Sequence, residues 1–427
     1  MREKMKAFLG ILVAVVVLFS LSACDSSSTT PEASFYQLET EVLEGRGTVE
    51  ISPDKDTYEE GDRVEIKAVP DENFNFVEWT GAINSSDKEE TIVIDDDMTI
   101  GVVFEVDQDI TGEGTEENPY RIYTAEGLQL MGEGNYSTNA FYELAKDIDL
   151  ADIEWTPAGS FNDPPESFFS GSFDGKGNLI ENMTIDHDDN FAGLFHMIYE
   201  GEVKNLTISN AEVETPPSAG EAGILAGQAI RSNISNVVVV ESFISGGSNV
   251  GGLLGTLYEG IVENSSVQAE VEGEDNLGGI VGGINAEAVI SNSFFDGSVY
   301  GDACAGGLAG WSSGTGDDSE IKNSYALGTV SAVNYIGGLV GDNAGYVTNS
   351  YAAVEINMRD SEGDSGGAIG INYGTIEGVY YDKQLSGLDD EGKGEPKTTQ
   401  EMMTKSTFSE WDFEEVWAIE DGYPFLQ

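Results

Sequence analysis

The chain has 427 residues, enough for two or three domains, and its composition is strongly acidic. It carries 78 Asp and Glu residues against 19 Lys and Arg residues, which gives a formal net charge of −59. This charge excludes nucleic acid as a partner, because phosphate binding requires clustered Lys and Arg. The charge favours solubility, as in a salty habitat where ions screen self-repulsion. The alternative is a surface that works through divalent cations such as calcium.

Residues 1–23 have the pattern of a secretion signal. A positively charged start precedes an apolar run, residues 7–21, that is too short for a permanent membrane span. The run ends in Leu21-Ser22-Ala23-Cys24, which resembles the lipobox of bacterial lipoproteins. The resemblance implies cleavage before Cys24 and lipidation of that residue, so that residues 24–34 form a tether outside a membrane. An ordinary signal peptide followed by a chance cysteine is the alternative.

Residues 35–105 alternate apolar and polar side chains between Gly and Pro residues, which predicts a small all-β module. The pattern Gly45-Arg46-Gly47-Thr48-Val49, followed by Phe76 and Trp79, resembles the divergent internalin-type B-repeat of bacterial surface proteins. The resemblance implies a spacer or an adhesion element. We expect Trp79 to lie in the core, with sugar stacking as the alternative.

Residues 106–118 are acidic and rich in turn formers, which predicts a linker. After it, Thr124 is placed to cap a short amphipathic helix. This helix would cover the open end of the repeat region that follows, because terminal repeats lack a neighbour on one side.

A short glycine phrase recurs down the second half of the chain at steps of 27 to 31 residues. Its seven copies are Ala192-Gly193-Leu194, Ala222-Gly223-Ile224, Gly251-Gly252-Leu253, Gly278-Gly279-Ile280, Gly306-Gly307-Leu308, Gly337-Gly338-Leu339 and Gly366-Gly367-Ala368. In register with it runs a column of Asn205, Asn236, Asn264, Asn292, Asn323 and Asn349, with Gly378 in the last copy. Such a period is the signature of stacked repeats.

The repeats predict an all-β fold, a right-handed parallel β-helix over residues 119–381 with one coil per repeat and short capping helices at its ends. Each repeat is too short for a propeller blade and cannot bury its own core, so it must stack on its neighbours. Glycine suits the bends, and stacked asparagines can bond to one another from coil to coil.

The phrase Gly337-Gly338-Leu339-Val340-Gly341, followed by Val347-Thr348-Asn349-Ser350-Tyr351, resembles the GLUG motif family. These repeats occur in bacterial surface proteins, adhesins and the N-terminal regions of immunoglobulin A-cleaving metallopeptidases. The resemblance implies a scaffold and names no activity.

An aromatic column, Phe294, Tyr325, Tyr351 and Tyr380, stands two residues after the asparagines. Even spacing from the aliphatic column Ile290, Ile321, Val347 and Ile376 places both columns on one face of a strand, so we expect an internal stacking ladder. An exposed strip for glycans is the alternative. Residues 382–427, with Trp411, Trp417 and other aromatic residues, are expected to close the last coil, and Thr398 to Glu401 read as a helical capping box.

No catalytic constellation stands out. His187 and His196 lie outside any His-Glu-x-x-His pattern, and neither a nucleophile elbow nor a phosphate loop is present. The cations Lys204, Arg231, Lys322 and Arg359 are scattered rather than columnar, which disfavours a polysaccharide lyase.

Two minor candidates for chemistry remain. Asp186, Asp188 and Asp189 with Asn190 are a candidate calcium site, although a solvated bend explains them as well. Cys304 has no partner for a disulfide if Cys24 is lipidated, so we expect a small buried residue there, with a reactive thiol as the alternative.

The resulting hypothesis is a non-enzymatic protein of the cell envelope, lipid-anchored to a membrane at Cys24 and exposed to the outside. Its rod would serve adhesion, binding an extracellular glycan or protein, without a cofactor. The alternatives are a carbohydrate-active β-helix enzyme, either a lyase or a hydrolase, and a purely structural spacer.

Overall fold

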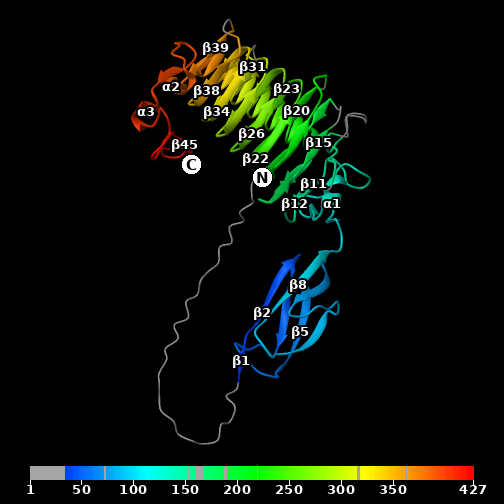
Figure 1. Ribbon diagram of the computed structural model, residues 1–427. Coiled ribbons are helices and arrows are strands. Elements are labelled where there is room, and N and C mark those ends of the chain that lie inside the picture. Colours follow the sequence, from blue (N-terminus) through cyan, green and yellow to red (C-terminus); the bar gives the residue numbers. More distant parts are fainter. Residues whose placement is uncertain are drawn as a thin grey trace, which may run out of the picture. The chain divides into compact units, whose positions relative to one another are not determined.

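The structure is a computed structural model that describes residues 34–71, 74–151, 153–159, 168–186, 190–218, 220–314, 318–360 and 363–427 (Figure 1). The expected signal and Cys24 lie outside the described residues. The chain divides into two compact units, residues 1–105 and 106–427. None of the helices in the described part is long and apolar enough to cross a membrane.

The first unit is a small β module built from two three-stranded sheets and a strand pair. Trp79 is fully buried in it, and its indole N–H donates to the backbone oxygen of Asp87 at 3.0 Å, which confirms the expected core position. One sheet has the order β2–β8–β6, the other β3–β5–β7, and β1 pairs with β4. Their bounds are β1 (Phe35–Tyr36), β2 (Leu38–Glu44), β3 (Gly47–Ser52), β4 (Tyr58–Glu59), β5 (Arg63–Pro70), β6 (Phe74–Gly81), β7 (Glu89–Val93) and β8 (Met98–Val106).

The second unit is a parallel β-helix, as predicted, with three sheets that run along its length (Figure 1). Sheet I holds β16 (Phe191–Ala192), β20 (Glu221–Gly223), β23 (Ser248–Gly251), β27 (Asp275–Gly278), β31 (Ala303–Gly306), β35 (Asn334–Gly337) and β39 (Ser365–Gly366). Sheet II holds β17 (Phe195–Tyr199), β21 (Ala226–Ile230), β24 (Leu254–Tyr258), β28 (Val281–Asn285), β32 (Ala309–Ser312), β36 (Val340–Asn343) and β40 (Ile369–Asn372).

Sheet III makes up the rest of each coil and contains the asparagine corner. Its strands are β9 (Ile110–Thr111), β10 (Tyr120–Ile122), β11 (Phe141–Leu144), β12 (Ile148–Asp149), β13 (Ser172–Asp174), β14 (Leu179–Glu181), β15 (Thr184–Asp186), β18 (Glu202–Ser209), β19 (Glu212–Glu214), β22 (Asn233–Ser245), β25 (Ile261–Glu263), β26 (Ser266–Glu272), β29 (Val289–Ser291), β30 (Phe294–Tyr300), β33 (Glu320–Lys322), β34 (Tyr325–Ala332), β37 (Tyr346–Thr348), β38 (Tyr351–Met358), β41 (Thr375–Glu377), β42 (Tyr380–Asp382) and β43 (Glu395–Lys397).

The glycine phrase forms the bend between sheets I and II, and a glycine just after the phrase lets the two backbones touch. A Cβ atom built on Gly341, in β36, would lie 2.6 Å from the carbonyl carbon of Cys304 and 2.7 Å from the nitrogen of Ala305, both in β31 of the preceding coil. No side chain fits between the sheets at this point. The leucine or isoleucine that follows the glycine pair is fully buried in the lumen, as in Leu253, Ile280, Leu308 and Leu339.

Each asparagine of the repeat turns a corner of sheet III in the left-handed conformation. The φ angles of Asn205, Asn236, Asn264, Asn292, Asn323 and Asn349 lie between 46° and 53°, and Gly378 takes 61° in the last copy. Asparagine tolerates this region because its short polar side chain bonds locally. The expected ladder is present at its start, where Asn236 Nδ2 donates to Asn205 Oδ1 at 3.4 Å.

The two ends of the β-helix are capped by short helices. At the first end Thr124 caps α1 (Ala125–Gln129) by accepting from the Gly127 N–H at 3.0 Å, as predicted. At the other end lie α2 (Lys383–Ser386), α3 (Thr399–Met402), with the predicted capping box between Thr398 and Glu401, and the 3₁₀ turn η2 (Lys405–Thr407).

The predicted C-terminal cap, residues 382–427, covers the last coil with its first part, whereas its aromatic residues lie elsewhere than predicted. The last coil is covered by residues 383–397, where the Lys393 carbonyl accepts from the N–H groups of Ala368 and Ile369. The C-terminal segment, residues 408–427, packs instead on the outer face of sheet III and contains the strand pair β44 (Trp417–Ala418) and β45 (Phe425–Leu426). It therefore covers several coils from the side.

Candidate functional site

The aromatic column is a stacked ladder, but it lies on the outer face of sheet III rather than in the lumen. Phe294 and Tyr325 stack with ring centroids 4.8 Å apart and planes 3° apart, and Tyr325 and Tyr351 with values of 5.1 Å and 6°. The column belongs to a hydrophobic cluster separate from the lumen. The aliphatic column, represented by Ile290 and Ile321, is buried in the lumen. The predicted stacking is confirmed for Phe294, Tyr325 and Tyr351, whereas Tyr380 packs edge-on against Phe408 and Trp411. The predicted face is wrong.

The asparagine corner accounts for this difference. Between Ile321 and Tyr325 the chain passes through Asn323, whose φ of 49° breaks the alternation of an extended strand. After the corner the inward position shifts by one residue, so Ala326 faces the lumen and Tyr325 faces outward. A slip of one residue exchanges the two faces of a strand.

The outer ladder is buried because the C-terminal segment covers it. Tyr325 and Tyr380 are each 7% exposed and Tyr351 is fully buried. Trp417 lies 6.1 Å from Tyr325 and 6.0 Å from Tyr351, ring centroid to ring centroid. The Tyr351 hydroxyl also donates to the Pro424 carbonyl at 2.7 Å. Burial raises the pKa of Tyr325 to about 12, so this hydroxyl stays neutral at physiological pH.

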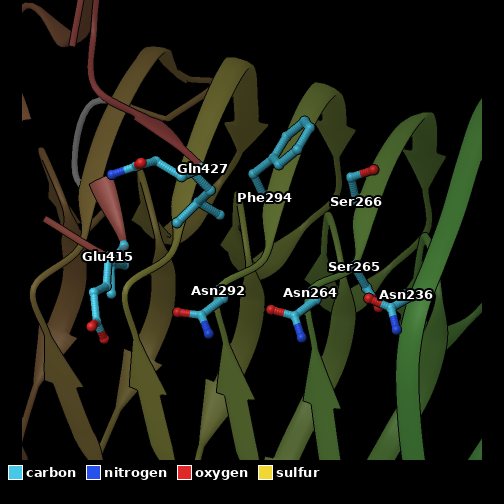
Figure 2. A pocket seen from close by; sticks show the side chains of 10 residues that line it. Asn236, Asn264, Ser265, Ser266, Asn292, Phe294, Glu415 and Gln427 are labelled. Carbon is cyan, nitrogen blue, oxygen red and sulfur yellow. The ribbon is translucent and has the colours of Figure 1, made fainter. Parts of the chain in front are cut away.

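The ladder stops at Phe294, because the same position of the preceding coil is Ser266. A groove of about 400 Å³ lies at this step. It is lined by Asn236, Asn264, Ser265, Ser266, Asn292, Phe294, Glu415, Val416, Leu426 and Gln427. Figure 2 shows Asn236, Asn264 and Asn292 in a row on consecutive coils, with Ser266 and Phe294 beyond the row and Glu415 and Gln427 at the Asn292 end.

The groove presents amides and hydroxyls beside one aromatic ring. Its ten lining residues include one carboxylate, Glu415, and no Lys or Arg. Within the described part of the chain, Oδ1 of Asn292 is shielded from solvent and accepts no hydrogen bond. A buried acceptor without a donor costs about 1–3 kcal/mol, so this amide oxygen is a weak point of the asparagine column.

A second ladder, which the sequence prediction missed, runs beside the asparagines. The backbone N–H of Ser265 donates to Ser293 Oγ at 3.1 Å. In the same way the N–H of Ser293 donates to Ser324 Oγ at 3.2 Å, and the N–H of Ser324 donates to Ser350 Oγ at 3.1 Å. These hydroxyls satisfy backbone N–H groups that the corner removes from the sheet. The signal was visible as the repeated Asn-Ser pair at 264–265, 292–293, 323–324 and 349–350.

The scattered cations of the repeats are held in ion pairs. Lys204 lies 2.6 Å from Glu202, and Lys322 lies 2.6 Å from Glu320. Arg231 bridges Glu200 and Glu259, and Arg359 pairs with Asp302 while its guanidinium lies over the Tyr300 ring. The structure does not bring these cations together, and each is already neutralised within its own stretch of the rod.

The remaining candidate residues do not form a common site. Cys304 is half-buried rather than fully buried, and burial, with Asp342 and Asp275 nearby, raises its pKa to about 11, which disfavours the reactive thiolate. His196 is buried against Phe191. His187, Asp188 and Asp189 lie outside the described residues, so the calcium candidate stays a prediction.

Two carboxyl groups of sheets I and II have raised pKa values, and they lie far apart. Burial raises the pKa of Glu221, in β20, and of Asp342, in β36. The order of the strands separates them by four coils, about 19 Å at the spacing of paired strands. Glycosidase carboxylates work at separations of about 5–10 Å. These two groups therefore do not form such a pair.

Comparison with known proteins confirms both predicted repeat types. Residues 38–108 match the divergent InlB B-repeat domain, and residues 301–331 match the GLUG motif. A crystal structure from Bacteroides ovatus, of a protein provisionally assigned as an immunoglobulin A1 protease, matches with a TM-score of 0.52 at 22% identity. The match covers 74% of this chain and 94% of that one, and at this identity it shows a shared fold.

Three curated relatives are similar over much of the sequence. A protein of Evansella cellulosilytica, provisionally named a Gly-rich membrane protein, is 32% identical over 73% of this chain and 45% of its own length. Halomucin of Haloquadratum walsbyi is 29% identical over 79% of this chain and 4% of its own length. The immunoglobulin A1 protease of Streptococcus sanguinis is 28% identical over 50% of this chain and 12% of its own length. The chain thus spans less than half of each relative.

Proposed function

We propose that this chain is a protein of the bacterial cell envelope, displayed outside the cell, that binds an extracellular ligand without chemical turnover. The observation that carries the proposal is the groove on the outer face of sheet III, with its row of amides beside Phe294. Polar groups placed around one apolar surface are typical of a binding site. Glu221 and Asp342, whose carboxyl pKa values burial raises, are too far apart to act together as one glycosidase pair.

The location rests on the N-terminal sequence and on the relatives. A relative provisionally named a Gly-rich membrane protein and halomucin are similar to 73% and 79% of this chain. The lipobox-like Leu21-Ser22-Ala23-Cys24 supports attachment through lipid at Cys24. The strongly acidic surface suits exposure to salt water, where ions screen self-repulsion.

A labelling experiment tests the location. Bacteria that express the full chain are fed a palmitate analogue, and intact cells are treated with a protease. We expect lipid label on the wild-type chain and cleavage of its repeat region on intact cells. Cys24→Ser loses the label, and Cys304→Ser, as the matched control, keeps it. An unlabelled wild-type chain, or one protected inside the cell, would contradict the proposed location.

A second experiment separates binding from catalysis. The full chain, purified in mild detergent, is incubated with cell-envelope and plant or algal polysaccharides, with and without calcium, while retention and reducing-end release are measured together. We expect retention without release. Release that grows with time and protein concentration would establish the enzyme instead, and retention of no polysaccharide or envelope protein would leave a spacer.

A further inference from the structure

Successive coils each add one aromatic ring to the outer ladder, and the coil that contains Ser266 adds none. Its rings repeat at 4.8 and 5.1 Å through Phe294, Tyr325 and Tyr351. Ser266 occupies the next position of the same column in the strand register. One face of Phe294 is covered by the ring of Tyr325, and the groove lies on the side of Ser266. The groove is thus the place of a missing rung.

We propose that this place is a subsite for one pyranose ring of a neutral glycan, stacked on Phe294. The proposal rests on the proposed binding function and names its ligand class. A pyranose carries weakly positive C–H groups on one face, which are attracted to the negative face of an aromatic ring.

The surroundings of the missing rung favour a sugar over an aromatic side chain of a partner protein. Asn264 and Asn292 each offer an amide that donates and accepts, and Ser266 adds a hydroxyl. An aromatic side chain would displace water from these groups and offer no hydrogen bonds in its place. This loss costs free energy. Sugar hydroxyls donate and accept, so they can replace the water that these amides and this hydroxyl lose.

The charge of the site selects neutral sugars. Glu415 lies at the groove, none of the lining residues is cationic, and the chain as a whole has a net charge of −59. A uronic acid or a sulfated sugar would meet repulsion without a counter-charge. Val416 and Leu426 of the C-terminal segment bound the groove with apolar surface instead.

The row of asparagines indicates a polymer rather than a single sugar. Asn236, Asn264 and Asn292 repeat once per coil, so equivalent amides recur about every 4.8 Å along the rod. A chain that starts on Phe294 can continue along this row toward Asn236, the end of the row opposite to Glu415 and Gln427 (Figure 2). Neighbouring residues of the glycan would then meet the same kind of amide.

Filling the missing rung provides the test. Ser266→Tyr supplies the ring that Tyr325 and Tyr351 supply in later coils, so the variant is expected to fold while its own side chain occupies the subsite. Ser298→Tyr is the control, because it places the same ring on sheet III, in β30, at a position that does not line the groove. Asn264→Gly removes one amide and keeps the left-handed corner, and Asn323→Gly does the same outside the groove.

The measurement is affinity electrophoresis of the full chain with soluble neutral glucans, mannans and galactans and with alginate as the anionic probe. We expect retention by at least one neutral polysaccharide and none by alginate. Ser266→Tyr should weaken that retention at least tenfold and Asn264→Gly severalfold, while Ser298→Tyr and Asn323→Gly match the wild type.

Three results would overturn the subsite. Retention that Ser266→Tyr leaves unchanged would refute it and leave the proposed binding function intact. Retention by alginate alone would refute the neutral ligand class. Retention of no polysaccharide would refute the subsite as well, and binding of an envelope protein in the separate assay above would then decide whether the wider proposal survives.

Discussion

At the scale of single residues, the corner asparagines decide which way each later side chain faces. Asn323 combines a left-handed φ of 49° with a side chain small and polar enough to tolerate it. Gly378 performs the same turn in the last copy with φ of 61°. The column is therefore defined by backbone conformation, and the identity of the side chain matters where it lines the groove.

Replacing Asn323 by alanine and by glycine separates these two roles. We expect Asn323→Ala to lower the free energy of unfolding by about 1 kcal/mol. Alanine adopts the left-handed conformation at a steric cost and forms no local hydrogen bond that would offset it. Asn323→Gly should cost less, since glycine adopts this φ freely. Thermal unfolding followed by circular dichroism compares the two variants. Equal losses in both would show that the amide, and not the backbone, stabilises the corner.

At the scale of elements, the bend between sheets I and II depends on the absence of side chains. The backbones of β31 and β36 approach so closely at Gly341 that an added Cβ meets backbone atoms, which cannot move aside as a flexible side chain can. The repeat therefore keeps its glycines for packing between sheets as well as for the turn.

A single methyl group at this contact should have a large effect. We expect Gly341→Ala to destabilise the rod by about 3 kcal/mol, the upper end of the cost of overpacking. Gly422→Ala is the control, because a Cβ there meets no atom within 4 Å and the backbone is not left-handed. Chemical denaturation of both variants checks this. A Gly341→Ala protein as stable as wild type would mean that the two sheets can separate freely.

The covered ladder makes the C-terminal segment sensitive to alkali. Burial raises the pKa of Tyr325 to about 12 and also raises that of Tyr351, while an unfolded tyrosine titrates near pH 10. The folded state holds these protons more tightly, so their contribution to stability is complete below about pH 10 and is lost as the pH rises toward about 12.

Removing one hydroxyl should shift this alkaline transition. Phenylalanine fits the column, as Phe294 shows, so Tyr325→Phe is expected to move the midpoint of alkaline unfolding to higher pH. Tyr346→Phe, at an exposed position of another column, is the control and should leave the midpoint in place. The fluorescence of Trp417 against pH provides the readout. A midpoint unchanged in Tyr325→Phe would exclude this ring as a determinant.

The elements that sequence reasoning predicted are those that repeat, and the ones it missed are those that do not. Glycine and asparagine columns carry the period, so the β-helix and its corners were predictable. The face of Tyr325 was not, because counting in steps of two treats Asn323 as extended. The groove was not either, because Val416 and Leu426 come from a segment without periodicity and more than a hundred residues from Ser266.

At the scale of the whole molecule, repulsion among carboxylates opposes folding along the entire rod. The chain's net charge of −59 is shared between the β module and the coils, and the coils stack at the close spacing of paired strands. Ion pairs such as Arg231 with Glu200 and Glu259 relieve it locally, yet exposed pairs contribute little. Screening by salt should therefore reduce much of the repulsion that remains.

We expect the melting temperature to rise as sodium chloride increases from about 0.01 M to about 1 M, where the screening length falls from about 30 Å to about 3 Å. Calcium chloride at matched ionic strength is the comparison. An equal rise in both salts indicates screening alone, whereas a further rise with calcium would reveal a specific cation site. A melting temperature that falls with salt would contradict the role given to repulsion.

The docking of the C-terminal segment also depends on whether the coils are stacked in the correct register. Trp417 contacts Tyr325 and Tyr351, which come from different coils, so the segment finds its full surface only when successive rings are in register. A molecule with a slipped coil would present a broken column and leave residues 408–427 loose. Loose chain termini are preferred sites of proteolysis. On an exposed surface, proteases would therefore cleave misassembled rods first. Rods with correctly stacked coils would keep their C-terminal segments docked and protected.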